Sequence, residues 1–171
     1  KVLEKHPHVY VVSDEIYEHI NFSGTFCSIA SIPGMLERTI TVNGVAKAFA
    51  MTGWRIGYIG APEFIAKACT KIQGQVTSGA NSIAQRATIT AVEADPSVLN
   101  EMVTAFKNRR DLVVGLVKEI PGFKLNVPEG AFYVFPDVSF YFGKTVKGTE
   151  IKNATDFSMF LLAEANVATV T

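Results

Sequence analysis

The sequence predicts an α/β fold followed by a smaller α+β region, and two observations support this prediction. Three short runs are rich in apolar and β-branched residues and are bounded by turn residues, which is typical of strands in a mixed or parallel sheet. These runs lie at residues 9–12, 39–42 and 56–60. Helical periodicity dominates residues 62–120, and from Pro121 short aromatic strands alternate with a last helix. We therefore predict two domains, residues 1–116 and residues 117–171.

The first run, residues 9–12, is apolar throughout, as expected of a parallel strand buried on both faces. The second, residues 39–42, stops at Asn43-Gly44, a turn dipeptide. The third closes at Pro62, which suits the first position of the helix that follows.

Three helices are predicted between the last of these strands and Pro121. Gly74 is expected to end the first helix. Ser82 and Gln85 match a capping box that opens the second. The longest periodic segment, residues 97–120, predicts a helix about 35 Å long that belongs to both domains. Its polar residues, Arg110 among them, are expected to face solvent.

The C-terminal region is predicted to be a partial small domain of α+β type. Residues 123–127 and 131–136 are expected to form strands, residues 141–148 a loop, residues 154–166 an amphipathic helix, and residues 167–171 a further strand.

Composition excludes several classes of function. The 171 residues are 48% hydrophobic and 19% charged, as in a globular protein. Sixteen basic and sixteen acidic residues cancel, so no net charge attracts nucleic acid or an anionic membrane. No apolar run approaches the roughly twenty residues of a membrane span, and no signal peptide opens the chain. Three histidines and two scattered cysteines do not predict a metal centre, and isolated cysteines favour a reducing, cytoplasmic location.

Lys47 lies among small and apolar residues, after the Asn43-Gly44 turn that ends the second predicted strand. Partial desolvation there is expected to lower the pKa of its ammonium, and a lysine that is neutral part of the time can form a Schiff base with an aldehyde. Arg55, eight residues later, carries a guanidinium that can bind a phosphate through two hydrogen bonds. The pair suggests a phosphorylated aldehyde such as pyridoxal phosphate, and the alternative is two ordinary surface residues.

Asp14 is the second residue after the first predicted strand, in the segment that begins at Ser13. Ligands of open α/β sheets gather beyond the carboxyl ends of strands, so a carboxylate here can pair with the ring nitrogen of pyridoxal phosphate. Tyr17 can reach the same ligand with its phenol. The alternative for Asp14 is a residue that caps the turn after the strand. Glu15 and Glu18 are expected to be solvated.

The segment GVAKAFAMTGWRIG, at residues 44–57, resembles the pyridoxal-phosphate attachment signature of the class I and II aminotransferases. It is most similar to the aspartate and prephenate aminotransferase branch, in which NG-x-[SA]-K-A-[FY]-A-M-T-G-W-R-[IL]-G-Y is typical. The resemblance implies that Lys47 forms the internal aldimine with the cofactor and that Arg55 binds the cofactor phosphate. Many members have a serine before the lysine that also contacts the phosphate. Ala46 replaces it here and removes that hydrogen bond.

The segment SDEIY, at residues 13–17, resembles a second element of the same family. There an aspartate contacts the pyridine nitrogen and a tyrosine hydrogen-bonds the ring hydroxyl, which implies these roles for Asp14 and Tyr17. The family has fold type I, and the resemblance implies a homodimer in which the loop at residues 73–81 reaches the site of the partner subunit.

The implied activity is transfer of an amino group between an amino acid, aspartate or a related dicarboxylic or aromatic precursor, and a 2-oxo acid. The resemblance covers the C-terminal portion of a subunit, with further chain expected before Lys1 and after Thr171, so the 171 residues alone are expected to be inactive. Two alternatives remain open: a β-eliminating lyase of the same fold, and a non-catalytic domain that resembles an aminotransferase.

Overall fold

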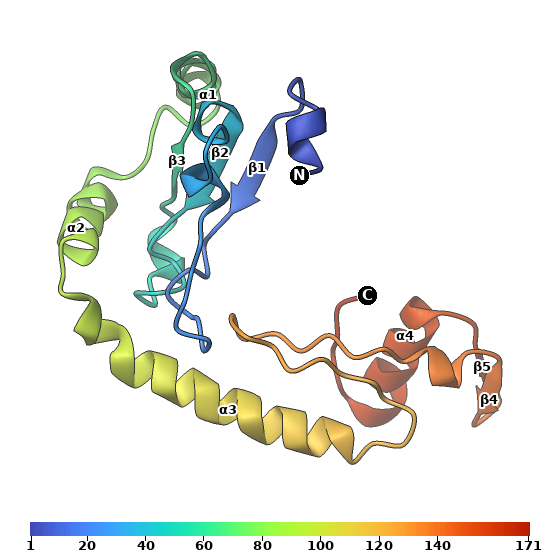
Figure 1. The fold of residues 1–171 in the computed structure, drawn as a ribbon. Helices are drawn as coiled ribbons and strands as arrows, with labels where there is room; N and C mark the ends of the chain where they lie inside the picture. Colours follow the sequence, from blue (N-terminus) through green and yellow to red (C-terminus); the bar gives the residue numbers. More distant parts are fainter. The chain divides into compact units, whose positions relative to one another are not determined.

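The computed structural model describes all 171 residues, which divide into two compact units. The first unit comprises Lys1–Phe106 and Glu129–Ala131, and the second comprises Lys107–Pro128 and Phe132–Thr171. The division falls inside the longest helix, α3 (Asn100–Lys118), which is continuous (Figure 1). The domain boundary predicted at residue 116 lies in the same helix and stays a prediction, because compactness alone does not define an independently folding domain.

A three-stranded mixed sheet organises the first unit (Figure 1). Its strands are β1 (Val11–Asp14), β2 (Thr39–Asn43) and β3 (Tyr58–Gly60). β2 is the central strand, parallel to β1 and antiparallel to β3. The expectation that the first strand is buried on both faces is wrong for this chain. β1 is an outer strand, and Val12 on it is 70% exposed.

The core of the first unit gathers around the two ends of β2. Ile20, Met35, Val45 and Ala48 are all buried, and burial of the three larger side chains contributes about 1.5–3 kcal/mol each. Thr39, also buried, donates its hydroxyl to the carbonyl of Met35. Val45 and Ala48 flank Lys47, so the core anchors the segment that carries this lysine.

Helices α1 (Glu63–Val76) and α2 (Ser82–Val92) follow β3. α1 begins at Glu63, one residue later than predicted, with Pro62 as the residue before it, and it continues past Gly74. A glycine inside a helix costs only about 1 kcal/mol relative to alanine, so it does not by itself end the helix. A short 3-10 helix, Pro96–Leu99, then leads into α3.

The cap of α2 differs from the prediction. Asn81 is the capping residue, and its Oδ1 accepts hydrogen bonds from the amides of Ile83 and Ala84 at 2.9 and 3.1 Å. Ser82 is already the first helical residue, and Gln85 donates to the carbonyl of Ala80. Asparagine and serine cap helices about equally well, so adjacent candidates cannot be ranked from the sequence.

The second unit contains the rest of α3, a hairpin of β4 (Lys144–Val146) and β5 (Thr149–Ile151), and α4 (Ala154–Ala165). The loop predicted at residues 141–148 is therefore wrong in part. Lys147 and Gly148 both have positive φ, 49° and 80°, as a two-residue type I′ turn requires. The strands are short and mostly exposed, so no apolar alternation marked them in the sequence.

Aromatic side chains of the second unit pack against α4, and the other strands predicted in this region are absent. Phe157 on α4 stacks on Tyr141 with ring centroids 5.1 Å apart and meets Phe123 at 6.0 Å. Residues 123–127 and 131–136 form no strand, and Lys124 makes an isolated bridge with Asp137, just beyond the second range. Residues 167–171 also form no strand.

Arg110, expected to face solvent, has a side chain only 13% exposed and donates to the carbonyl of Pro128. Its long side chain reaches back to a segment 18 residues away, a contact that helical periodicity does not encode. None of the helices combines the length and apolar character needed to cross a membrane.

Candidate active site

Three chain segments meet at one edge of the sheet. β1 ends at Asp14, opposite Val42, and β2 ends one residue later, at Asn43. Because β3 is antiparallel, it begins at this same edge, with Tyr58 opposite Asn43. The edge therefore receives the turn after β1, the segment after β2 and the segment before β3. Carboxyl ends of parallel strands are where α/β proteins bind ligands.

Two glycines set how closely the second and third segments approach. A Cβ atom on Gly44 would lie 3.2 Å from the Cα of Gly57 and 3.2 Å from the carbonyl oxygen of Ile56. It would also lie 3.3 Å from Cδ1 of Ile16, in the turn after β1. These distances are tighter than ordinary van der Waals contact, so all three segments pack around the position that glycine leaves open.

Lys47 follows β2 in a turn that spans residues 46–49. Its Nζ lies 5.7 Å from the centroid of the Tyr17 ring, within the range of a cation–π interaction. The structure thus brings together two of the four predicted site residues. The expected apolar surroundings are present in the buried Val45 and Ala48, but Lys47 itself is only half-buried.

Asp14 and Tyr17 line a common cavity of about 340 Å³. Oδ1 of Asp14 accepts a hydrogen bond from the amide of Ile16 at 3.2 Å, which is the turn-capping contact considered as the alternative. This contact involves only one carboxylate oxygen, and the Asp14 residue is exposed. Capping and ligand binding are therefore compatible at this residue.

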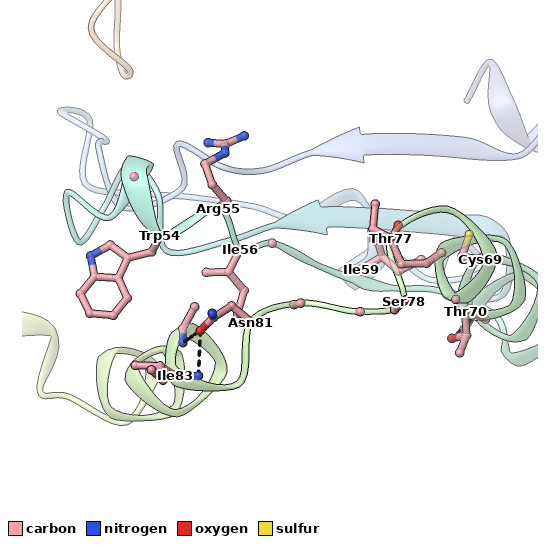
Figure 2. Close-up of a pocket in the computed structure, with 18 of the residues that line it drawn as sticks. Trp54, Arg55, Ile56, Ile59, Cys69, Thr70, Thr77, Ser78, Asn81 and Ile83 are labelled. Carbon is pink, nitrogen blue, oxygen red and sulfur yellow. Dashed lines mark hydrogen bonds between the residues drawn. The ribbon is translucent and has the colours of Figure 1, made fainter.

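Arg55 lies just before β3, after the 3-10 helix Thr52–Trp54, and its backbone is left-handed with φ 53°. Its Nη1 donates to the carbonyl of Thr52 at 2.8 Å. In Figure 2 the guanidinium and the side chain of Ile56 lie on opposite sides of the backbone, with Ile56 directed toward Asn81. The turn conformation thus separates the charged group from the apolar side of the segment.

A larger cavity, of about 1310 Å³, lies between the segment before β3 and helices α1 and α2 (Figure 2). Of the four predicted site residues it includes only Arg55. Thr77 and Ser78, in the loop expected to reach a partner subunit, also line it. Cavity volume therefore does not mark the candidate site here, because the amine, the phenol and the carboxylate lie elsewhere along the sheet edge.

Glu15 and Glu18, which the sequence predicted to be solvated, both make internal hydrogen bonds. Glu15 is 7% exposed and accepts from the hydroxyls of Ser13 and Ser28 at 3.0 and 2.7 Å. Glu18 accepts from Nδ2 of Asn43 at 2.8 Å. Ser28 lies 13 residues from Glu15, and Asn43 lies 25 residues from Glu18, so no local pattern could have identified these two partners.

The charge of Glu18 also affects a neighbouring phenol. Burial, and secondarily the Glu18 carboxylate, raise the pKa of Tyr58 above its usual value, because both disfavour the phenolate. Tyr58 is paired with Asn43 in the sheet, so Glu18 acts on both residues at this edge.

No group of three or more histidine, cysteine, aspartate or glutamate side chains is arranged to hold a metal ion.

The sheet and the residues at its edge place this chain among α/β proteins with a candidate cofactor-binding lysine. All of residues 1–171 match the model of the family described as aminotransferase class I and II, and the chain belongs to that family. It is 48% identical over 175 residues to a bifunctional aspartate aminotransferase and glutamate/aspartate-prephenate aminotransferase of Petunia hybrida, covering 99% of this chain and 36% of the relative. It is 47% identical over 173 residues to an aspartate aminotransferase of Rhizobium meliloti (strain 1021), covering 99% of this chain and 42% of the relative.

Solved structures agree with this assignment. The crystal structure of an aspartate aminotransferase from Rhizobium meliloti superposes with a TM-score of 0.90 at 46% identity, covering 99% of this chain and 43% of that one. An aromatic aminotransferase from Pyrococcus horikoshii OT3 superposes with a TM-score of 0.84 at 37% identity, again covering 99% and 43%. The predicted α/β fold of type I with a small α+β part is confirmed. The chain spans about 36% to 43% of the length of these proteins.

Proposed function

We propose that the protein to which this chain belongs is a pyridoxal-phosphate-dependent aminotransferase. It moves an amino group between an amino acid, aspartate or a related dicarboxylic or aromatic one, and a 2-oxo acid. The main support is the position of four residues on segments that meet at one edge of the sheet. They are Lys47, Tyr17, Asp14 and Arg55, which carry an amine, a phenol, a carboxylate and a guanidinium. Relatives named aspartate and aspartate/prephenate aminotransferases support the choice of substrates.

The chemistry of these residues fits pyridoxal phosphate. Lys47 offers a primary amine for the aldehyde, and Arg55 offers a guanidinium for the phosphate. Asp14 suits the protonated ring nitrogen, and Tyr17 suits the ring hydroxyl. When bound, the cofactor supplies an electron sink that makes the substrate α-carbon acidic.

Each side chain then has a defined task. Lys47 would hold the cofactor through its amine, and the same amine is the base that would take the proton from the substrate α-carbon. The Tyr17 ring, 5.7 Å from Nζ, limits the positions open to that amine. Asp14 would keep a proton on the ring nitrogen, and Arg55, whose backbone is left-handed, would hold the phosphate through its guanidinium.

Borohydride reduction of the full-length, cofactor-loaded protein tests this proposal. Reduction is expected to fix a phosphopyridoxyl group on the peptide that contains Lys47, as detected by mass spectrometry. Lys47→Ala is expected to prevent this labelling and to lower amino transfer by at least about 100-fold. Lys67→Ala is the matched control, because Lys67 lies on α1 and pairs only with Glu63 at the surface. Labelling at another lysine, or none, would contradict the assignment.

Requirement for an amino acceptor separates transfer from β-elimination. An aminotransferase forms a 2-oxo acid from its donor in steady state only when a second 2-oxo acid is present. Steady release of ammonia and a 2-oxo acid without an acceptor would instead identify a lyase, and the absence of both reactions would identify a non-catalytic member.

We also propose a cytoplasmic homodimer. Ile72, Val76 and Ile83, on α1 and α2 beside the loop that contains Thr77 and Ser78, are 65% or more exposed, which supports a packing partner on this face. Both cysteines, Cys27 and Cys69, are unpaired, which supports a reducing compartment. Sedimentation of the full-length protein measures the first, and cell fractionation the second.

A further inference from the structure

The turn after β1 is a compact element that carries three consecutive polar or aromatic side chains. The amide of Glu18 donates to the carbonyl of Glu15, and the amide of Ile20 donates to that of Tyr17, each at 2.9 Å. Ile20, 1% exposed, anchors the end of the turn in the core. Tyr17, Glu18 and His19 therefore project from a well-defined backbone.

Each of these three side chains contacts either the last residue of β2 or the segment that follows it. Tyr17 lies under the Nζ of Lys47, and the ring of His19 meets that of Phe49 edge to face at 6.2 Å. Between them, Glu18 accepts the 2.8 Å hydrogen bond from Asn43. The two segments are thus joined in three places, and the Glu18 bond is the only one of the three that is a directional hydrogen bond to a buried group.

Asn43 has one orientation in this arrangement. It is 9% exposed, its Oδ1 accepts from the amide of Gly44 at 2.7 Å, and its Nδ2 donates to Oε1 of Glu18. Both ends of the side-chain amide are hydrogen-bonded. If the amide were reversed, its oxygen would face the Glu18 carboxylate and its NH2 group would face the Gly44 amide, so neither bond could form. The Asn43 side chain therefore connects the backbone leading into Lys47 with the turn that bears Tyr17.

We propose that Glu18 is a positioning residue for Lys47, which it holds against Tyr17 through Asn43. This inference rests on the proposed function, because it assigns a role in the same site. Glu18 acts through Asn43, to which it is hydrogen-bonded, and it lines the same cavity as Asp14 and Tyr17. Its carboxylate also lies 3.2 Å from Nε2 of His19 and acts on Tyr58, so a role through charge alone has to be separated from a role through the hydrogen bond.

Three substitutions in the full-length protein separate these roles. Glu18→Gln keeps an oxygen acceptor at the same reach but removes the charge. Glu18→Asp keeps the charge but shortens the side chain by one methylene, and Glu18→Ala removes both. Glu119→Ala is the matched control, because Glu119 is an exposed glutamate beyond the end of α3.

If the hydrogen bond positions Lys47, Glu18→Gln keeps kcat near that of the parent, whereas Glu18→Asp and Glu18→Ala lower it by about 10- to 100-fold with a smaller change in KM. Displacement of a reacting group by about 1 Å has effects of this size. The pH titration of the absorbance of the lysine-bound cofactor is expected to shift in the same two variants. A purely structural role would lower the melting temperature without moving that titration.

A second readout needs no cofactor. The rate at which an amine-reactive ester acylates Lys47 in the cofactor-free protein, followed by peptide mass spectrometry, is expected to change in Glu18→Asp and Glu18→Ala but not in Glu18→Gln or Glu119→Ala. Lack of amino transfer by the parent protein would reject the proposed function and leave this measurement valid. Parent-like acylation in all variants, or a change confined to Glu18→Gln and Glu18→Ala, would overturn the positioning role.

Discussion

Replacing Gly44 with alanine tests how the candidate site is assembled. The new Cβ would meet the Cα of Gly57 and the carbonyl oxygen of Ile56 at 3.2 Å, so the segments after β2 and before β3 must separate by a few tenths of an ångström. Lys47 lies three residues beyond the substitution on one segment, and Arg55 lies two residues before Gly57 on the other. A local change in packing therefore acts on both candidate cofactor-binding residues.

The expected magnitude follows from two opposing terms. Added volume at a tightly packed position destabilises by about 1–3 kcal/mol. Alanine also reduces the entropy of the unfolded chain, which stabilises by about 0.4–1 kcal/mol where φ is permissive. Gly44 does not have the positive φ that would add strain, so a net destabilisation of up to about 2.6 kcal/mol remains, with a midpoint of about 1.3 kcal/mol.

Urea unfolding of the full-length protein at a fixed protein concentration measures this effect. Gly60→Ala is the control, because Gly60 lies in β3 and its Cβ would have no atom within 4 Å. That variant is expected to be as stable as the parent or up to about 1 kcal/mol more stable. Gly44→Ala is also expected to release the cofactor faster. Equal stability of the two alanine variants would refute the close packing of the segments.

Further predictions concern other parts of the first unit. The folded protein holds the phenol proton of Tyr58 more tightly than the unfolded chain does, so its stability contribution is complete below about pH 10 and is lost as the pH rises through the raised pKa. Tyr58→Phe is expected to lose less stability than the parent between about pH 9 and 11, as measured by urea midpoints; a loss equal to the parent's would contradict this. Asn81→Ala is expected to lower the free energy of unfolding by about 0.5–2 kcal/mol, and Ser82→Ala by less than about 0.5 kcal/mol, because Asn81 caps α2. A larger loss in Ser82→Ala than in Asn81→Ala would identify Ser82 as the cap. Ala46→Ser restores the hydroxyl found in many family members and is expected to tighten cofactor binding by up to about 10-fold in an equilibrium titration, whereas weaker binding would show that the hydroxyl does not reach the phosphate.

Much of the fold follows from local patterns in the chain. β2 and α4 were predicted to within one or two residues, because apolar runs, periodicity and flanking turn residues are local properties. The strands predicted at residues 123–127 and 131–136 are absent: Phe123 in the first range packs on Phe157 of α4, and Phe135 in the second is 90% exposed. The hairpin of β4 and β5 was missed because its strands are short and its turn depends on the positive φ of Lys147.

The candidate site divides in the same way. Lys47, Asp14, Tyr17 and Arg55 were selected from sequence alone, by residue type after a strand and by family resemblance, and their roles stay predictions. Glu18 was taken for a surface residue because its partner, Asn43, is 25 residues away.

The sequence by itself determined the family and predicted the three strands and Lys47 as a candidate site residue, because a long motif and short-range hydrophobic patterns lie in consecutive residues. Only the tertiary structure decided that β1, β2 and β3 present their residues at one edge, and that Glu18 and Asn43 join two turns there. Strand direction, register and a hydrogen bond between distant residues depend on how the chain returns on itself. No local pattern of residues specifies that path.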